Sequence, residues 1–175
     1  MQKEKKIGIA GIGNFILRDE GFGVHVIHYL QEHYTFPDQV EIQDVGTAGI
    51  YMAPFLEECD PIFVVDVVDM AGEPGSFHFF DLDDVKAGNF QTRMSPHQLG
   101  LLEILEVSKL RDAAPEHVEF YTVIPKELEE SVELSEVVEQ RKVEVAEMIL
   151  ARLADLGVQV TRKSTGQQLP KPNRR

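Results

Sequence analysis

The stretch from residue 7 to residue 23 constrains the fold of this chain more than any other part of the sequence. It opens with the apolar run Ile7–Ile12, which carries no charge and is typical of a strand buried on both faces, as in a parallel sheet. Gly11 and Gly13 predict a tight turn in which backbone can come close to a ligand. Apolar residues then recur at helical spacing, at Val24, Ile27 and Leu30. The stretch therefore predicts a strand, a glycine turn and a helix.

The glycine turn does not follow the dinucleotide-binding pattern. Gly11-x-Gly13 would require a third glycine at the position that Ile16 occupies. Asp19 and Glu20 stand at the helix entrance, where they would repel a phosphate group. Carboxylates at that place suit a cation. The simpler interpretation makes Asp19 an N-cap and Glu20 a first-turn acid that complements the helix dipole, and the stretch alone leaves both interpretations open.

Composition narrows the classes of function. The 175 residues suffice for one domain with a full core, and a formal net charge of -13 argues against nucleic acid and anionic membranes as partners. No apolar run reaches the ~18–20 residues that span a bilayer, and the N-terminal residues show no signal-peptide pattern. The expectation is a soluble cytoplasmic protein. The single Cys59 excludes an internal disulfide framework, and the acids beside it predict a structural thiol rather than a nucleophile.

Strand patterns and helix patterns alternate along the chain. Strands are predicted at 7–12, 40–44, 61–68, 76–80 and 118–124, and helices at 24–34, 48–58 and 96–109. The short connection before 76–80 indicates an antiparallel edge strand, and His78 in it is expected to point to solvent because it alternates with phenylalanines. Pro54 requires the helix at 48–58 to start late or to kink. This alternation predicts an α/β domain with a mostly parallel sheet.

The C-terminal part of the chain predicts one more helix and a tail. Within the acidic residues 126–156, one helical face is apolar, at Val138, Val145, Ile149 and Leu153. Gly157 is expected to end this helix as a C-cap. Residues 161–175 carry basic side chains, two prolines and no apolar pattern, which predicts a flexible basic tail. We therefore expect a single domain over residues 1–160, followed by the tail.

A strong helix-start signal precedes the helix at 96–109. Ser95 is suited to the N-cap and Pro96 to the first helical position. The buried face of this helix is predicted at Leu99, Leu102 and Leu105, with Ile104 nearby. His97 then lies in the first turn, where the helix dipole favours the neutral imidazole that ligates metals. The histidines of the first helix show no ligand spacing and are interpreted as surface or packing residues: His25, His28 and His33.

Three polar residues fall at strand ends or helix starts. Asp66 interrupts the most apolar run of the chain near its C-terminal end, where a lone carboxylate is costly unless it is paired, hydrogen-bonded or bound to a metal. In parallel sheets, ligands bind beyond the C-terminal ends of the strands. Glu20, Asp66 and His97 would there offer two carboxylates and one imidazole to a borderline divalent cation, with open coordination positions. Spacing alone does not show that the three residues meet.

Four separated motifs resemble those of the hydrogenase maturation proteases, at Gly11–Gly23, Asp44–Gly49, Val65–Asp66 and Ser95–Gly100. The resemblance covers about residues 5–158, and the motifs follow one another in the same order. The members of this family are endopeptidases that trim the C-terminus of the nickel-iron hydrogenase large subunit. The resemblance implies a three-layer fold, in which a twisted five-stranded sheet lies between helices.

The resemblance also implies roles for particular residues. The metal ligands of the family map to Glu20, Asp66 and His97. A second family motif maps to residues that we expect, with less specific roles, to contact substrate: Asp44, Gly46, Thr47 and Gly49. The implied metal is nickel carried by the substrate and ligated transiently, without an organic cofactor. The implied partner is the nickel-loaded large-subunit precursor, from which a C-terminal extension is removed.

The sequence leaves the catalytic group unassigned, because no recognisable nucleophile elbow is present. A metal-polarised carbonyl, a metal-activated water and a carboxylate base all remain open. Two other functions also remain open. One is a nickel-checkpoint chaperone that binds the same precursor without cutting it. The other is a nucleotide-binding enzyme, which rests only on Gly11-x-Gly13 and Asp44.

Overall fold

The computed structural model describes residues 4–47, 49–87 and 96–164, and a five-stranded sheet forms its centre. The strand order is β3-β1-β4-β6-β5. Four strands run parallel, namely β1 (Lys6–Ile12), β3 (Val40–Gly46), β4 (Cys59–Val67) and β6 (Val118–Val123). The edge strand β5 (Phe77–Asp81) pairs antiparallel with β6. This confirms the predicted mostly parallel sheet and its antiparallel edge.

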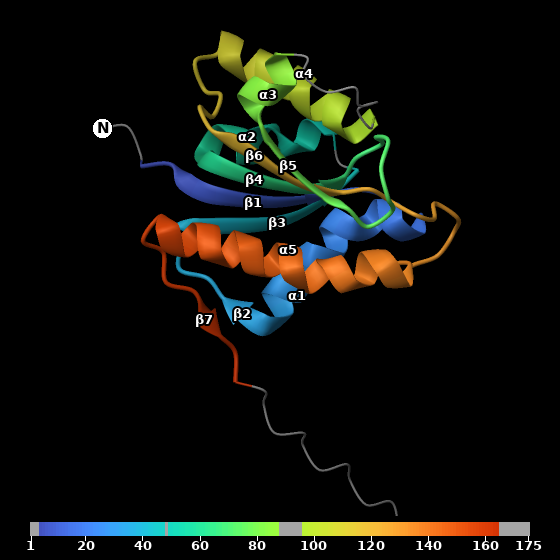
Figure 1. Cartoon of the computed structure of the whole chain (residues 1–175). Helices are drawn as coiled ribbons and strands as arrows, with labels where there is room; N and C mark the ends of the chain where they lie inside the picture. Colours follow the sequence, from blue (N-terminus) through green and yellow to red (C-terminus); the bar gives the residue numbers. More distant parts are fainter. Residues whose placement is uncertain (1–3, 48, 88–95, 165–175) are drawn as a thin grey trace, which may run out of the picture.

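Helices cover both faces of the sheet and give three layers (Figure 1). One face carries α1 (Phe22–His33) and α5 (Glu136–Asp155), and the other carries α2 (Ala53–Glu58), α3 (Leu82–Lys86) and α4 (Pro96–Leu110). Short 3-10 turns, η1 (Arg18–Gly21) and η2 (Gly49–Met52), precede α1 and α2. Each face has its own apolar core. In the described part of the chain, no helix is both long and apolar enough to cross a bilayer.

Two helices differ in detail from their predicted form. As predicted for a late start, α2 begins at Ala53, and Pro54 lies in its first turn, where no backbone hydrogen bond is lost. The predicted buried face of α4 is wrong at Leu99, which is 51% exposed. The buried stripe is Leu101, Ile104 and Leu105, because these residues follow the i, i+3, i+4 pattern on the side facing the sheet. Ser95 lies outside the described residues.

The start of the predicted tail is part of the fold. Thr161–Arg162 forms β7, which pairs antiparallel with β2 (Tyr34–Thr35) at the end of α1. Gly157 follows α5 with a φ of 78°, as expected of a residue that ends a helix. The rest of the predicted tail, residues 165–175, lies outside the described residues.

The glycines of the first motif serve contacts inside the protein. A Cβ on Gly11 would overlap the carbonyl oxygen of Gly23, and a Cβ on Gly23 would overlap that of Val65. Gly13 has a φ of 136°, and its missing side chain leaves room for the carbonyl of Glu20. The two glycines therefore let α1 and η1 pack closely against β1, and Gly13 also lines a hollow at the sheet edge, so the expectation of a ligand close to this backbone stays a prediction.

Replacing Gly23 by alanine should lower the free energy of unfolding by about 3 kcal/mol or more, since the added methyl group meets backbone atoms that cannot rotate away. Urea denaturation followed by circular dichroism measures the change. Gly100→Ala is the matched control in α4, because a Cβ there meets nothing within 4 Å. The control should be neutral or stabilising by up to about 1 kcal/mol. Equal midpoints for the two variants would contradict this account of helix packing.

Candidate metal-binding site

Two of the predicted ligands lie together at the C-terminal edge of the sheet. Glu20 belongs to η1, and His97 is the second residue of α4, as its helix-start signal predicts. His97 Nε2 lies 3.6 Å from Glu20 Oε1, and the two side chains are 19% and 20% exposed. The fold thus brings an imidazole and a carboxylate, from segments far apart in sequence, into reach of one ligand.

Asp66 lies at the same edge but is more deeply enclosed. It is the penultimate residue of β4, is fully buried, and its Oδ1 accepts a hydrogen bond of 2.7 Å from the N–H of Val67. β4 also contacts η1, the turn that carries Glu20. Glu20, Asp66 and His97 do not form a tight group of the kind that would have ligand atoms within 4.8 Å of one another. The three donors therefore share an edge without forming a closed cage.

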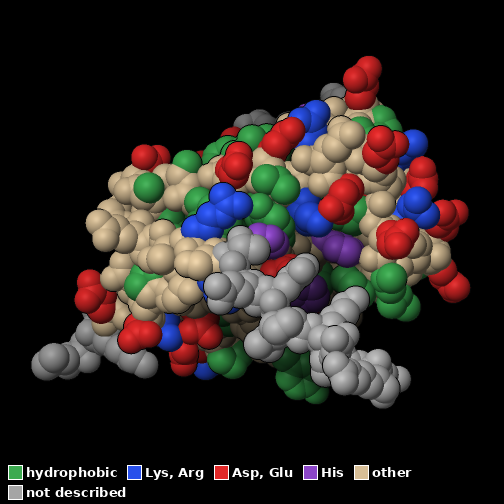
Figure 2. Space-filling model, turned by 90° about the horizontal axis from the view of Figure 1, so that it is seen from below, with side chains coloured by type: hydrophobic (Ala, Val, Ile, Leu, Met, Phe, Trp, Pro, Cys, Tyr) green, Lys and Arg blue, Asp and Glu red, His purple; other side chains and the backbone are tan. Residues whose placement is uncertain are grey.

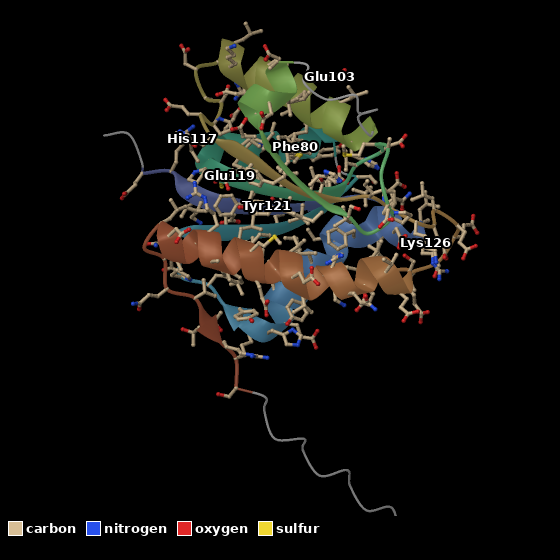
Figure 3. The ribbon with its side chains drawn as sticks, in the orientation of Figure 1. Phe80, Glu103, His117, Glu119, Tyr121 and Lys126 are labelled. Carbon is tan, nitrogen blue, oxygen red and sulfur yellow. The ribbon has the colours of Figure 1, made fainter. Side chains whose placement is uncertain are left out.

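A tight group of potential metal ligands lies at the opposite edge. The ligand atoms of Asp60, Glu116 and His117 are within 4.8 Å of one another, the one such group among the described residues. Figure 3 shows His117 and Lys126 at opposite ends of β6. The Asp60 carboxylate already accepts hydrogen bonds from the N–H groups of Glu116 (2.9 Å) and His117 (3.1 Å). These hydrogen bonds explain the group without a metal, as a structural link between the starts of β4 and β6.

Asp19 has a role that differs from the predicted N-cap. It is fully buried, and its carboxylate accepts four hydrogen bonds of 2.7–2.8 Å. The donors are the N–H groups of Lys126, Glu127 and Ser135 and the hydroxyl of Ser135. Ser135 is the residue before α5, so the carboxylate also lies at the positive end of that helix. Asp19 therefore fixes η1 to the segment between β6 and α5.

Further contacts join the same two segments. Arg18 forms ion pairs with Glu127 (2.9 Å) and Glu129 (2.6 Å), and Leu17 forms a β-bridge with Ser131. Because these contacts flank Glu20 on its N-terminal side, they set the position of the turn from which its side chain projects. The sequence gives no signal for them, since the partners are more than a hundred residues apart.

The predicted substrate-contact residues form a turn between two hollows. Gly46 and Thr47 line both a hollow of about 320 Å³, shared with Phe15 and Asp44, and a smaller one of about 130 Å³ next to His97. Gly46 and Gly49 have φ values of 53° and 54°, which glycine adopts without strain. The turn is therefore placed to meet a ligand on either side.

The larger hollow contains a pair that the spacing of the histidines does not reveal. His28 Nε2 lies 2.8 Å from Asp44 Oδ2, and the ring of Phe15 tilts against that of His28 with centroids 5.8 Å apart. Figure 2 shows histidine and acidic side chains close together on the face seen from below. Asp44 and His28 are both partly exposed, and together they give the hollow a polar wall.

Solved structures with the same fold define the class of protein. The hydrogenase maturating endopeptidase HybD from Escherichia coli superimposes with a TM-score of 0.84 at 32% identity, covering 92% of this chain and 99% of that one. The HybD maturation protease of Thermococcus kodakarensis superimposes with a TM-score of 0.69 at 21% identity, which shows the fold alone. The fold is that of the hydrogenase maturation endopeptidases.

Sequence comparison gives the family. A model of the hydrogenase maturation protease family matches residues 24–152. The chain is 34% identical over 155 residues to the hydrogenase 2 maturation protease of Escherichia coli, which covers 88% of this chain and 94% of that protein. It is 33% identical over 163 residues to the hydrogenase expression/formation protein HupD of Bradyrhizobium diazoefficiens, covering 93% and 85%. The chain belongs to the hydrogenase maturation protease family, and it is a peptidase.

Asp19→Asn should lower the free energy of unfolding by about 3 kcal/mol, because the amide turns one acceptor into a donor that faces other donors in a buried site. Thermal and urea unfolding measure the loss. Glu20→Gln is the control next to it, and its side chain is not part of this network, so stability should change by less than about 1 kcal/mol. The anchoring role of Asp19 does not hold if both variants unfold at the wild-type midpoint.

Cys59 should be inert in the folded protein. It is fully buried at the start of β4, and burial, followed by the charges of Glu41 and Glu58, raises the pKa of the thiol to about 12. At about pH 8 the thiol is therefore protonated and shielded, so a chromogenic disulfide reagent should react only after urea unfolds the chain. Rapid reaction of the native protein would contradict the structural role. Cys59→Ala should leave peptidase activity unchanged.

Proposed function

We propose that this peptidase removes the C-terminal extension of a nickel-iron hydrogenase large-subunit precursor after nickel has been inserted, and that it recognises the nickel held by the substrate. The observation that carries the proposal is the approach of His97 to Glu20 at the sheet edge that also holds Asp66. The three residues offer hard oxygens and one imidazole nitrogen, which suit a borderline divalent ion that substrate thiolates already hold. They would bind that ion from the protease side.

The open arrangement of the three donors supports a transient contact. A structural zinc site has four ligands in a closed tetrahedron, whereas this edge offers three donors with Asp66 set deeper than the other two. The protein alone should therefore bind nickel weakly, and the substrate should supply the remaining ligands. In this proposal Glu20, Asp66 and His97 coordinate the nickel of a loaded precursor. Only the loaded form is then positioned for cleavage.

The nucleotide-binding alternative rests on Gly11, Gly13 and Asp44. The absent side chains of the two glycines make room for the backbone of Gly23 and Glu20, and Asp44 pairs with His28, so each residue has a role that needs no nucleotide. The nickel-checkpoint chaperone remains the second candidate for the same site. It shares every contact of the proposal and differs only in leaving the precursor intact.

The test is a mass spectrum of the large-subunit precursor after incubation with the protein, with and without nickel loading. We expect loss of a C-terminal peptide from the nickel-loaded form only. Asp66→Ala and His97→Ala should slow this cleavage by roughly 100-fold or more. His117→Ala is the matched control, because it removes an imidazole at the opposite edge of the sheet, and it should cleave at the wild-type rate.

Other outcomes would change the proposal in defined ways. Cleavage of both forms would keep the protease and remove nickel as its signal. A stable complex with intact, nickel-loaded precursor would favour the checkpoint chaperone. Wild-type rates for Asp66→Ala and His97→Ala would remove both residues from the site.

A further inference from the structure

A row of polar residues crosses the sheet from Asp66 towards its edge. Asp66 in β4 is in register with Thr122 in β6, and Thr122 is in register with His78 in β5. Residues in register on neighbouring strands project from the same face of a sheet. This is the face covered by α4, because the alternate residues Val64, Phe120 and Phe80 belong to the core that contains Leu101. His78 therefore does not simply point to solvent, contrary to the prediction from sequence.

The ring nitrogen Nε2 of His78 is shielded from solvent but lacks a hydrogen-bond partner among the described residues. The backbone carbonyl of His78 is satisfied, since it accepts a hydrogen bond of 2.9 Å from the fully buried Thr122 hydroxyl. A buried polar atom without a partner is destabilising, and native proteins keep few of them. A hydrogen-bonding group of a bound substrate would account for its retention at this place.

On the opposite face of the same strands, the buried polar groups of Glu119 and Tyr121 are paired. The Glu119 carboxylate accepts hydrogen bonds of 2.8 Å from the Tyr121 hydroxyl and 2.7 Å from Arg152 Nη2 of α5. Burial and the contact with Glu119 raise the pKa of Tyr121. Figure 3 shows Glu119 and Tyr121 near each other in the middle of the molecule. There the polar groups pair with one another, whereas the ring nitrogen of His78 faces the α4 side unpaired.

The distance between Asp66 and His78 limits which part of a bound substrate His78 can contact. Two strand spacings of about 4.8 Å put His78 roughly 10 Å from Asp66, too far to ligate the same ion. An extended polypeptide advances about 3.3 Å per residue, so about three residues cover that distance. A precursor chain that leaves the nickel and runs over the strand ends towards β5 would bring a peptide group to His78.

We propose that His78 is a substrate-contact residue, whose imidazole hydrogen-bonds a peptide group of the precursor about three residues from the nickel-bound residue. The inference rests on the proposed function. It adds that the precursor chain runs over the strand ends from β4 across β6 to β5. In the complex with the precursor, the Nε2 of His78 then has a hydrogen-bond partner.

The experiment measures kcat and KM for cleavage of the nickel-loaded precursor by wild type, His78→Phe and His78→Gln, with the melting temperature of each protein. For His78→Phe we expect KM to rise about tenfold, which is the loss of one hydrogen bond, with kcat within about twofold. Its melting temperature should be unchanged or higher by about 2–4 °C, because an unpaired polar atom has been removed. His78→Gln should keep KM within about threefold, because its amide can make the same bond.

His25→Phe is the matched control. Its Nε2 is also buried without a partner among the residues described, but it lies on α1, near Lys142 and Glu139 of α5. Its ring stacks on that of Phe15 with centroids 4.8 Å apart, a contact that phenylalanine can keep. Burial lowers the pKa of His25, as for a packed imidazole. This variant should leave KM unchanged.

A wild-type KM for His78→Phe would overturn the inference, and so would an equal rise in KM for His25→Phe. A fall in melting temperature for both His78 variants together with an unchanged KM would make His78 a packing residue. If wild type binds the nickel-loaded precursor but does not cut it, the proposed function fails. The contact of His78 with the precursor can still be tested by measuring the Kd of the complex. His78→Phe should then weaken that complex about tenfold, and an unchanged Kd would overturn the inference.

Discussion

The candidate site depends on one buried carboxylate, that of Asp19. A charged group without partners in the interior is strongly destabilising, and here four donors from the segment between β6 and α5 satisfy it. The helix dipole of α5 adds a favourable field, because Ser135 directly precedes the helix. The next residue, Glu20, projects from the turn that this network holds. An interaction that stabilises the fold thus also positions the residue that we propose to contact the nickel of the substrate.

The sequence alone predicts the layers of this fold well, because burial on a sheet leaves a local pattern. The apolar runs of β1 and β4, the late start of α2 at Pro54 and the place of His97 in the first turn of α4 all follow from rules that act over a few residues. The edge position of β5 also follows, from the short connection before it.

What the sequence could not predict depends on distant contacts. The partners of Asp19 lie more than a hundred residues along the chain, and the close approach that needs Gly11 and Gly23 depends on how α1 packs on β1 and β4. The orientation of His78 is set by its register with Thr122, which alternation with phenylalanines does not reveal. The approach of Glu20 to His97 is likewise a product of topology. For each of these residues, a tertiary contact that no local pattern encodes decides the role.

The adjacency of Asp19 and Glu20 makes their turn a mechanical link. One side chain is tied to the segment between β6 and α5, and the other reaches the sheet edge beside His97. That segment carries Leu128 and Val132, which are 54% and 53% exposed. Asp19 and Glu20 are joined by a single peptide unit, so the anchored carboxylate and the carboxylate beside His97 belong to one turn. A change in the position of the segment that holds Asp19 would therefore act on the turn that carries Glu20.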